Sequence, residues 1–368
     1  MASFMLNSAR VTGFLSNAGN HFTFNGVRAL STSCRHEAAK TKKSLAKQNV
    51  KNIVLVEGVR TPFLMSGTEY KDLMPHDLQR EAMKGLIERT SIPKDSVDHI
   101  VVGTVIQEVK TSNVAREVML VLRVITSCRS RVFRRIPAHT VTMACISSNQ
   151  AITSGMGMLA SGQADTIIAG GVDFMSDAPI RHSRQMRKFM LNLGKAKTAG
   201  AKMSLASRHL SMAALAPEVT VEAIFNGIRP SSEAQMARLK PAFIKPHGLH
   251  LLVLLYPRSG LTLDDIDVFE IHEAFAGQIL ANLNALGSDY WCQNFLGAKS
   301  KLGAIPMDKM NLWGGSLSIG HPFGATGVRL ATTSANRLEK EDGQFAVLAA
   351  CAAGGHGHAM VVERYPSS

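Results

Sequence analysis

The stretch Thr140-Val141-Thr142-Met143-Ala144-Cys145-Ile146-Ser147-Ser148-Asn149 carries a cysteine at the point where a β-branched run passes into a helical segment. Backbone N–H groups at the start of a helix favour a negative charge, so a thiolate is stabilised at such a position. A single cysteine among apolar neighbours is as often an inert core residue. The context of Cys145 favours a strand–turn–helix unit with a nucleophilic thiol, and we expect that thiol to ionise near neutral pH.

Three later stretches also place reactive side chains in unusual backbone settings. They are Ile271-His272-Glu273-Ala274-Phe275, Gly320-His321-Pro322-Phe323-Gly324-Ala325-Thr326-Gly327 and Leu348-Ala349-Ala350-Cys351-Ala352-Ala353-Gly354-Gly355-His356-Gly357. Two cysteines and two histidines occur in such settings. The interpretation that all four are inert core residues is therefore a poor one. The pattern predicts acyl transfer through a thioester.

Glycines surround two of these side chains. Gly320 and Gly324 flank His321, where they let the backbone approach a bound group closely. Cys351 follows an apolar strand and enters a turn that contains Gly354 and Gly355. We expect His321 to take the proton of Cys145, and Cys351 to act as a second proton carrier.

The chain also repeats one unit. A helix that opens at Cys145 leads to the apolar run at 166–171, and a helix that opens after His321 leads to the run at 345–350. Short continuous apolar runs are typical of strands in a parallel sheet that is covered on both faces. Further strands are expected at 52–56, 100–105 and 266–271. Strands that alternate with helices predict an α/β fold with an internal duplication.

The four motifs, in this order, resemble those of the thiolase family, and most closely its mitochondrial trifunctional branch. The resemblance covers about 50–117, 137–216 and 261 to the C-terminus. It implies a duplicated, five-layer αβαβα fold that is incomplete in this chain. It divides the chain into a leader at 1–36, a first half at 50–225 with a basic loop at 178–217, a shortened connection at 226–260 and a second half at 261–368.

The resemblance also implies the roles of the site residues. Cys145 is acylated, His321 activates it, and Cys351 moves protons at the leaving or attacking group. His272 helps to form one oxyanion hole, and the backbone N–H groups of Cys145 and Ala353 form another.

The implied activity is that of a 3-ketoacyl-CoA thiolase of mitochondrial fatty-acid β-oxidation. Coenzyme A is a co-substrate, and no tightly bound cofactor is expected. The implied partners are the 3-ketoacyl-CoA substrate, the alpha subunit (hydratase and dehydrogenase) of the trifunctional complex and a second copy of the chain. Two alternatives are a decarboxylating ketoacyl synthase, which Cys351 argues against, and a catalytically impaired partner of the alpha subunit.

Composition limits the class of protein. The chain's five cysteines show no framework spacing, which favours a reducing compartment. No Cys-x-x-Cys or His-Glu-x-x-His motif is present, so we expect no metal site. No apolar run reaches the roughly 18 residues that a membrane-spanning helix needs.

The formal net charge of +13 is concentrated in three segments, at 1–50, 123–135 and 178–217. Residues 1–36 contain Arg10, Arg28 and Arg35, several serines and no acidic residue. This composition predicts a mitochondrial transit peptide rather than a secretory signal. The other interpretation is an N-terminus without a targeting role.

The third basic segment alternates cations with bulky apolar residues around Arg181, Arg184, Arg187 and Lys188. Such a mixture suits a surface helix on anionic lipid. The family resemblance implies that this lipid is the matrix side of the inner membrane. The alternative is a basic lid near the phosphates of coenzyme A. Nucleic acid is not expected, because no RNA-binding motif accompanies the charge.

The chain departs from the family's pattern between its halves. Thiolases carry there a long stretch whose Asn-Ser-Ser…Asp-Gly-Ala segment enters the sheet of the first half. Here Lys245-Pro246-His247-Gly248 is followed closely by Leu261-Thr262-Leu263-Asp264, and an Arg-rich stretch stands between 117 and 137. Loss of a central strand predicts exposed sheet edges and an unstable or weakly active chain.

Overall fold

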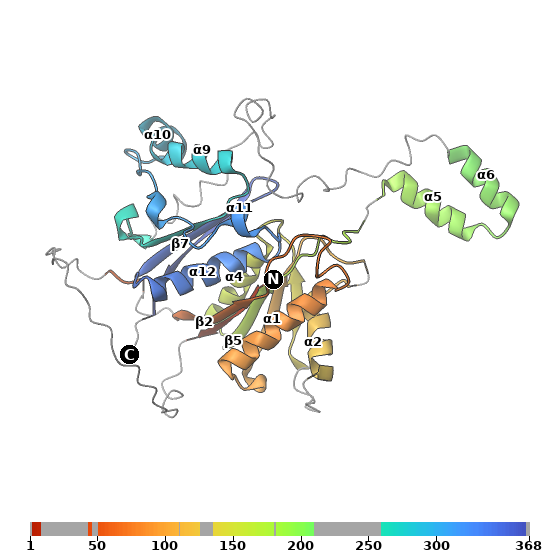
Figure 1. The fold of residues 1–368 in the computed structure, drawn as a ribbon, viewed down its shortest axis with the longest axis horizontal. Coiled ribbons are helices and arrows are strands. Elements are labelled where there is room, and N and C mark those ends of the chain that lie inside the picture. The colour runs from red at the N-terminus through yellow and green to blue at the C-terminus, as the bar shows by residue number, and fades with distance from the viewer. Residues whose placement is uncertain are drawn as a thin grey trace.

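The computed structural model describes residues 2–8, 43–45, 51–109, 111–125, 135–179, 182–209 and 259–365. Two β-sheets with helices on their faces form the body of the molecule (Figure 1). The strands are β1 (Ala2–Ser8), β2 (Ile53–Arg60), β3 (His99–Gly103), β4 (Ala138–Val141), β5 (Thr166–Gly171), β6 (Val268–Ile271), β7 (Phe345–Ala352) and β8 (His356–Glu363). Their order is β2-β1-β5-β3-β4 in the first sheet and β6-β7-β8 in the second.

The helices alternate with these strands along the chain. The α-helices are α1 (Pro75–Thr90), α2 (Val114–Ile125), α4 (Ser147–Ser161), α5 (Arg184–Lys195), α6 (Ala199–His209), α9 (Ala276–Leu286), α10 (Asp289–Leu296), α11 (Ser316–Ile319) and α12 (Thr326–Lys340). Short 3-10 turns are η1 (Lys94–Ser96), η4 (Leu263–Asp265) and η5 (Met307–Lys309).

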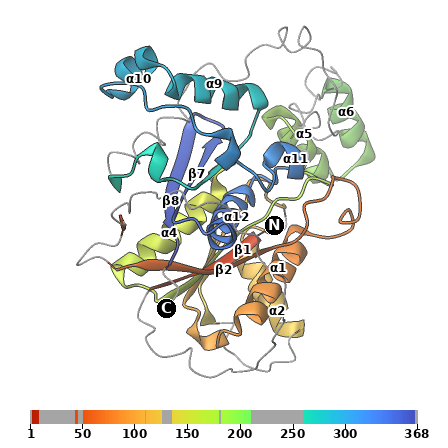
Figure 2. The ribbon, with the colours of Figure 1, turned by 60° about the vertical axis from the view of Figure 1, so that its left-hand side comes forward.

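Successive strand residues face opposite helical layers, as the period of two requires. In β3, Ile100 and Val102 belong to the core beneath α1 and α2, whereas Val101 belongs to the core around α4 and α12. In β7, Leu348 faces that same central core, and Val347 faces the core beneath α9. Figure 2 shows α4 and α12 between the two sheets. The layering is αβαβα, which confirms the predicted α/β fold.

The predicted internal repeat is present. In the first half, β4 leads through the Cys145 turn to α4 and then to β5, which pairs in parallel with β3. In the second half, the His321 turn leads to α12 and then to β7, which pairs in parallel with β6. The expected strands at 166–171 and 345–350 correspond to β5 and β7.

The strand β1 lies between β2 and β5 and runs antiparallel to both. Ala2 is paired with Arg60 on one side and with Gly171 on the other. In the second sheet, β8 lies antiparallel to β7 in the place that corresponds to β1 beside β5. The expectation that loss of a family strand leaves an open position in the first sheet is therefore wrong for this structure, because residues 2–8 of the predicted leader fill it. Residues 9–36 of that leader lie outside the described residues.

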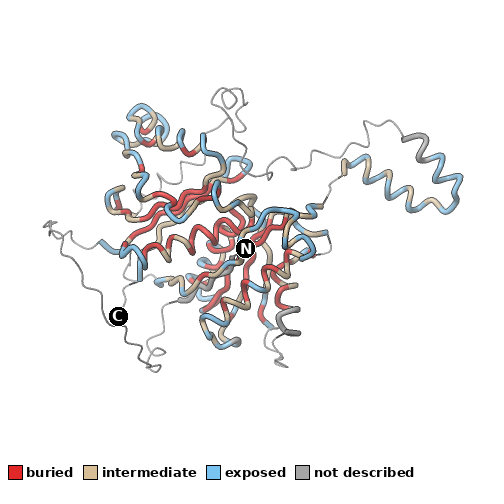
Figure 3. The backbone as a smooth tube through the Cα atoms, in the orientation of Figure 1, coloured by how far each residue is buried: buried red, intermediate tan, exposed pale blue. Residues whose placement is uncertain are grey.

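The basic segment forms α5 and α6, which lie side by side and away from both sheets (Figure 1). Arg184, Arg187 and Lys188 are on α5, and α5 has no buried residue. Figure 3 shows that the described parts of both helices are exposed or only half-buried. Arg181, the connection at 226–258 and the arginines at 129–134 lie outside the described residues.

Candidate active site

The turn that carries Cys145 has a strained backbone. Ala144, the preceding residue, has a φ of 46°, in the left-handed region that costs a non-glycine residue about 1–3 kcal/mol. The hydroxyl of Ser147 stabilises this turn, because it accepts a hydrogen bond from the N–H of Met143 at 2.8 Å and donates one to the carbonyl of Ala144 at 2.7 Å. A sharp turn between strand and helix is a setting that presents a nucleophile to a substrate.

The His321 turn packs directly against the first half. A Cβ atom on Gly171, at the end of β5, would lie 1.8 Å from the carbonyl oxygen of Gly324, so no side chain fits there. The N–H of Val328 donates to the hydroxyl of Ser148 at 3.1 Å, which joins the first turns of α12 and α4. The two halves therefore meet at the starts of their repeated helices, where the sequence places Cys145 and His321.

The Cys351 turn lies beside Cys145. Gly354 and Gly355 have φ values of 87° and 78°, which lets the chain reverse between β7 and β8. The backbone N–H groups of Ala353 and of Cys145 itself both interact with the Cys145 sulfur. These are the two N–H groups that the family resemblance assigns to an oxyanion hole.

Both thiols are half-buried, and burial governs their ionisation. Burial raises the pKa of Cys145, the N–H of Ala353 lowers it, and the carboxylate of Asp173 raises it. Burial likewise raises the pKa of Cys351, and the nearby Cys145 raises it further. The expectation that Cys145 is a stabilised thiolate near neutral pH is therefore wrong for this structure, because desolvation outweighs the backbone N–H groups. The thiol needs a base.

His321 is the base that the family resemblance implies, and its ring is uncharged. Burial, with a smaller effect of the Arg329 cation, lowers the pKa of His321 to about 4, so the ring is neutral at pH 7. The Nδ1 atom lies 2.6 Å from the hydroxyl oxygen of Thr326, whose own hydrogen has an acceptor in the carbonyl of Pro322 at 3.1 Å. Thr326 can then accept from Nδ1–H, which leaves a lone pair on Nε2. Among the described residues, Nε2 of His321 has no hydrogen-bond partner.

His272 lies next to His321, with 4.1 Å between the ring centroids. Its backbone N–H donates to the carbonyl of Ala349 at 2.8 Å, which fixes the end of β6 beside β7. Burial, His321 and Arg329 together lower the pKa of His272 well below its ordinary value. The predicted catalytic and oxyanion residues therefore gather at the junction of the halves, whereas Arg184, Arg187 and Lys188 lie apart on α5.

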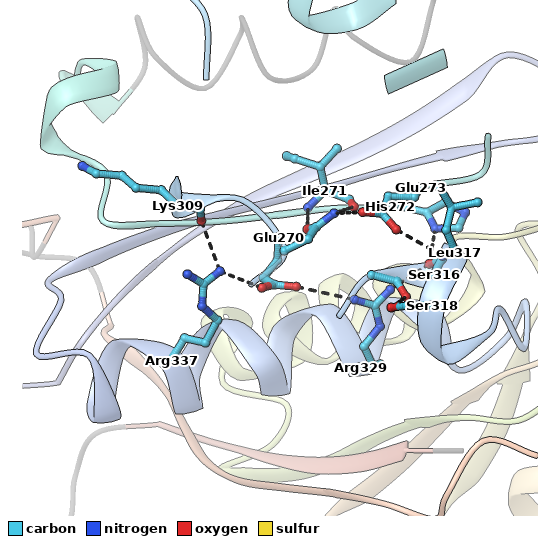
Figure 4. A network of polar contacts seen from close by, with 12 residues as sticks. Glu270, Ile271, His272, Glu273, Lys309, Ser316, Leu317, Ser318, Arg329 and Arg337 are labelled. Carbon is cyan, nitrogen blue, oxygen red and sulfur yellow. Dashed lines mark hydrogen bonds and ion pairs between the residues drawn. The ribbon is translucent and has the colours of Figure 1, made fainter. Parts of the chain in front are cut away.

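A buried ionic network that was not expected from the sequence lies beside His272 (Figure 4). Glu270 pairs with Arg337 at 2.9 Å and with Arg329 at 3.5 Å, and each side chain is at most 1% exposed. Burial raises the pKa of Glu270, and the two arginines oppose that rise. The sequence signal for this network is Glu270, a lone glutamate inside the apolar strand Val268–Ile271. A charged carboxylate in such a strand needs a buried partner.

A second missed residue is Gln278 on α9, whose Oε1 atom lies 3.9 Å from the sulfur of Cys351. No cluster of His, Cys, Asp and Glu in the described part of the chain has the geometry to hold a metal ion. None of the helices in the described ranges combines the length and apolar character that crossing a membrane requires.

Comparison with known proteins gives consistent matches along the chain. The family profile described as "Thiolase, N-terminal domain" matches residues 53–226, and the profile described as "Thiolase, C-terminal domain" matches residues 234–364. The mouse protein named "Trifunctional enzyme subunit beta, mitochondrial" is 45% identical, and the alignment covers 93% of this chain and 95% of the mouse protein. The alignment spans 462 positions, more than the 368 residues of this chain, so it includes gaps in this chain.

Two further relatives extend the comparison. A Caenorhabditis elegans protein named "Probable 3-ketoacyl-CoA thiolase" is 42% identical, over 92% of this chain and 99% of that protein. The crystal structure of the Bacillus anthracis acetyl-CoA acetyltransferase superimposes with a TM-score of 0.56 at 19% identity, covering 83% of this chain and 96% of that one. At this identity the superposition supports the fold alone.

Proposed function

The chain belongs to the thiolase family and is an acyltransferase, and from this premise we propose that it is a 3-ketoacyl-CoA thiolase of fatty-acid β-oxidation. The observation that carries the proposal is that two half-buried thiols, Cys145 and Cys351, lie beside each other at the junction where the turn of the neutral His321 packs against the first half. Thiolysis needs a nucleophile, a base for it and a second acid–base group, and these residues supply all three.

The first half-reaction breaks the bond between C2 and C3 of the substrate. His321 accepts the Cys145 proton at Nε2, and the thiolate attacks the keto carbon C3. As the tetrahedral adduct collapses, the C2–C3 bond breaks and its electron pair passes into the enolate of acetyl-CoA. The thiol of Cys351 protonates that enolate at C2, acetyl-CoA leaves, and the shortened acyl group remains as a thioester on Cys145.

The second half-reaction returns the enzyme to its starting state. The Cys351 thiolate takes the thiol proton of coenzyme A, and the coenzyme A thiolate attacks the acyl carbon on Cys145. The Cys145 sulfur then leaves with its electron pair and recovers a proton from His321. We propose that the N–H groups of Cys145 and Ala353, and the side chain of His272, stabilise the oxyanions that form in the two half-reactions.

The relatives' names support a cellular setting for this reaction. The name of the mouse relative supports a mitochondrial setting and an alpha subunit as partner. We propose in addition that two copies of the chain form a homodimer. The exposed α5 bears Arg184, Arg187 and Lys188 among apolar residues, with Met190 48% and Leu191 65% exposed. This surface supports peripheral binding to anionic lipid on the matrix side of the inner membrane. Flotation with cardiolipin-rich and with neutral vesicles tests it, and equal recovery from both would contradict it.

The test of the activity is coenzyme A-dependent cleavage of a long-chain 3-ketoacyl-CoA by the purified chain. Cys145→Ala and Cys351→Ala should both abolish turnover, and Cys292→Ala should not, because Cys292 is a buried cysteine whose sulfur contacts carbonyls of Ala285 and Leu286. Absence of activity in the soluble, folded chain would contradict the proposal and favour a non-catalytic partner of the alpha subunit.

A further inference from the structure

The side chain of His272 is held at one ring nitrogen by a short chain of hydrogen bonds. The Nδ1 atom of His272 lies 2.9 Å from Oγ of Ser316, and Nη2 of Arg329 donates to the same oxygen at 2.8 Å. All three side chains are buried, with exposures of 1% for His272, 6% for Ser316 and 1% for Arg329. Figure 4 shows these residues beside the Glu270 network.

The direction of these hydrogen bonds follows from the chemistry of the donors. A guanidinium group can only donate, so Ser316 Oγ is the acceptor of the Arg329 bond. The Ser316 hydroxyl hydrogen then needs an acceptor, and the one within reach in the described structure is Nδ1 of His272. A buried hydroxyl that donates to nothing destabilises the fold, because it loses the hydrogen bond that it makes to water in the unfolded chain.

From this accounting we infer that Ser316, oriented by Arg329, fixes the neutral His272 ring as the Nε2–H tautomer and so makes it a dedicated hydrogen-bond donor in the active site. Its Nε2 atom is buried and without a protein partner among the described residues. An atom in that state is available to a substrate oxygen. Ser316 and Arg329 are positioning residues in this account, and they act on the substrate only through His272.

The Nε2 atoms of the two adjacent histidines then have opposite roles, one as a proton acceptor and the other as a proton donor. Thr326 can accept from Nδ1–H of His321, which leaves Nε2 of His321 as a proton acceptor. Ser316 donates to Nδ1 of His272, which leaves Nε2–H of His272 as a proton donor. The hydroxyl of Thr326 therefore makes His321 a base, and the hydroxyl of Ser316 makes His272 an oxyanion donor. The two rings differ in this way although their centroids are only 4.1 Å apart.

The inference rests on the proposed thiolase function, and a double-mutant cycle tests it. Ser316→Ala should lower kcat about 10- to 100-fold, as loss of such an outer hydrogen bond commonly does, with a smaller change in KM. His272→Ala should lower kcat about 100- to 1000-fold, as removal of an oxyanion donor does. In the His272→Ala background, Ser316→Ala should then change kcat less than about twofold, because the two act through one donor.

Two further variants separate positioning from folding. Ser318→Ala is the matched control, because Ser318 lies on the same short helix and its hydroxyl donates to the backbone carbonyl of Gly315 at 3.0 Å. It should leave kcat unchanged. Ser316→Thr keeps the hydroxyl and should restore most of the activity, and the thermal midpoint of each variant reports any loss of folding.

The tautomer itself can be read without any turnover. In protein labelled with ¹⁵N-histidine, the resonances that disappear in His272→Ala should show a proton on Nε2 and an unprotonated, hydrogen-bonded Nδ1. A proton on Nδ1, or an equal effect of Ser316→Ala with and without His272, would overturn the inference. The spectrum does not depend on activity. An inactive wild-type chain would therefore contradict the proposed function, whereas the tautomer of His272 would still be decided by the spectrum.

Discussion

The carboxylate of Asp173 accepts a hydrogen bond from the backbone N–H of Gly324 and so ties the end of β5 to the turn that carries His321. Its other oxygen accepts from the N–H groups of Val105 and Ile106 at 3.0 and 2.7 Å. Burial raises the pKa of Asp173 to about 6, against the effect of these donors. The group is therefore mostly ionised at pH 7 and lies close enough to raise the pKa of Cys145.

Replacement of this carboxylate should make Cys145 more acidic. Asp173→Asn removes the negative charge, so the pH midpoint for alkylation of Cys145 by iodoacetamide should fall below that of the wild type. The measurement is the alkylation rate against pH, with the modified peptide identified by mass. Asp177→Asn, an exposed change in the same loop, is the control. A midpoint that stays fixed or rises in Asp173→Asn would be inconsistent with the charge effect.

The neutral state of His321 makes stability depend on pH in a definite direction. The folded-state pKa of about 4 lies below the ordinary value of 6.5, so the unfolded chain binds a proton first as the pH falls. The contribution of His321 to stability is therefore complete above pH 6.5 and is lost as the pH falls toward 4. The thermal midpoint of His321→Gln should fall less steeply over this range than that of the wild type. The same pH dependence of the thermal midpoint in His321→Gln and in the wild type would contradict this prediction. His356→Gln, at an exposed position, serves as the control.

The Glu270 network should contribute stability only as an intact unit. Glu270→Gln leaves Arg329 and Arg337 buried without their shared carboxylate, and breaking one partner of a buried ion pair costs about 3–5 kcal/mol. Urea denaturation should show this loss, whereas Glu339→Gln on the exposed side of α12 should change the unfolding free energy by less than about 0.5 kcal/mol. Equal stability of the two variants would mean that Glu270 does not hold the arginines.

The position of β1 between β2 and β5 in the first sheet gives a direct test of the N-terminal segment. Deletion of residues 2–8 should expose the facing edges of β2 and β5, lower the thermal midpoint and promote association. A synthetic peptide of residues 2–8 should restore the midpoint in part, and the same peptide with Met5→Pro should not, because proline lacks an N–H for the ladder. An unchanged, monodisperse deletion variant would exclude a structural role for β1.

The sequence allowed the reactive residues to be predicted because each stands beside glycines or at a change of periodicity. Cys145, His321 and Cys351 are recognisable from such local signals, and so are the repeated helices and β5 and β7. The pairing of β1 could not be predicted, because its partners lie more than forty residues away and no local pattern records them. The ionisation of Cys145 was predicted in the wrong direction, since the helix start is visible in the sequence and the degree of burial is not.

The roles of the polar residues around His272 could not be predicted from the sequence for a related reason. Ser316 and Arg329 are ordinary surface residues by type, and only the fold shows that both are buried against His272. A hydroxyl or guanidinium becomes informative when its hydrogen bonds can be counted, and that count requires neighbours from three separate segments of the chain.

Acyl transfer through a thioester on Cys145 can be observed in the intact mass of the chain. The chain is allowed to react briefly with a 3-ketoacyl-CoA in the absence of coenzyme A, and peptide mapping then locates the added group. The account predicts one added acyl group per chain, located on Cys145, that disappears when coenzyme A is added and never forms in Cys145→Ala. An acyl group on Cys351 alone, or cleavage that continues in Cys145→Ala, would contradict it.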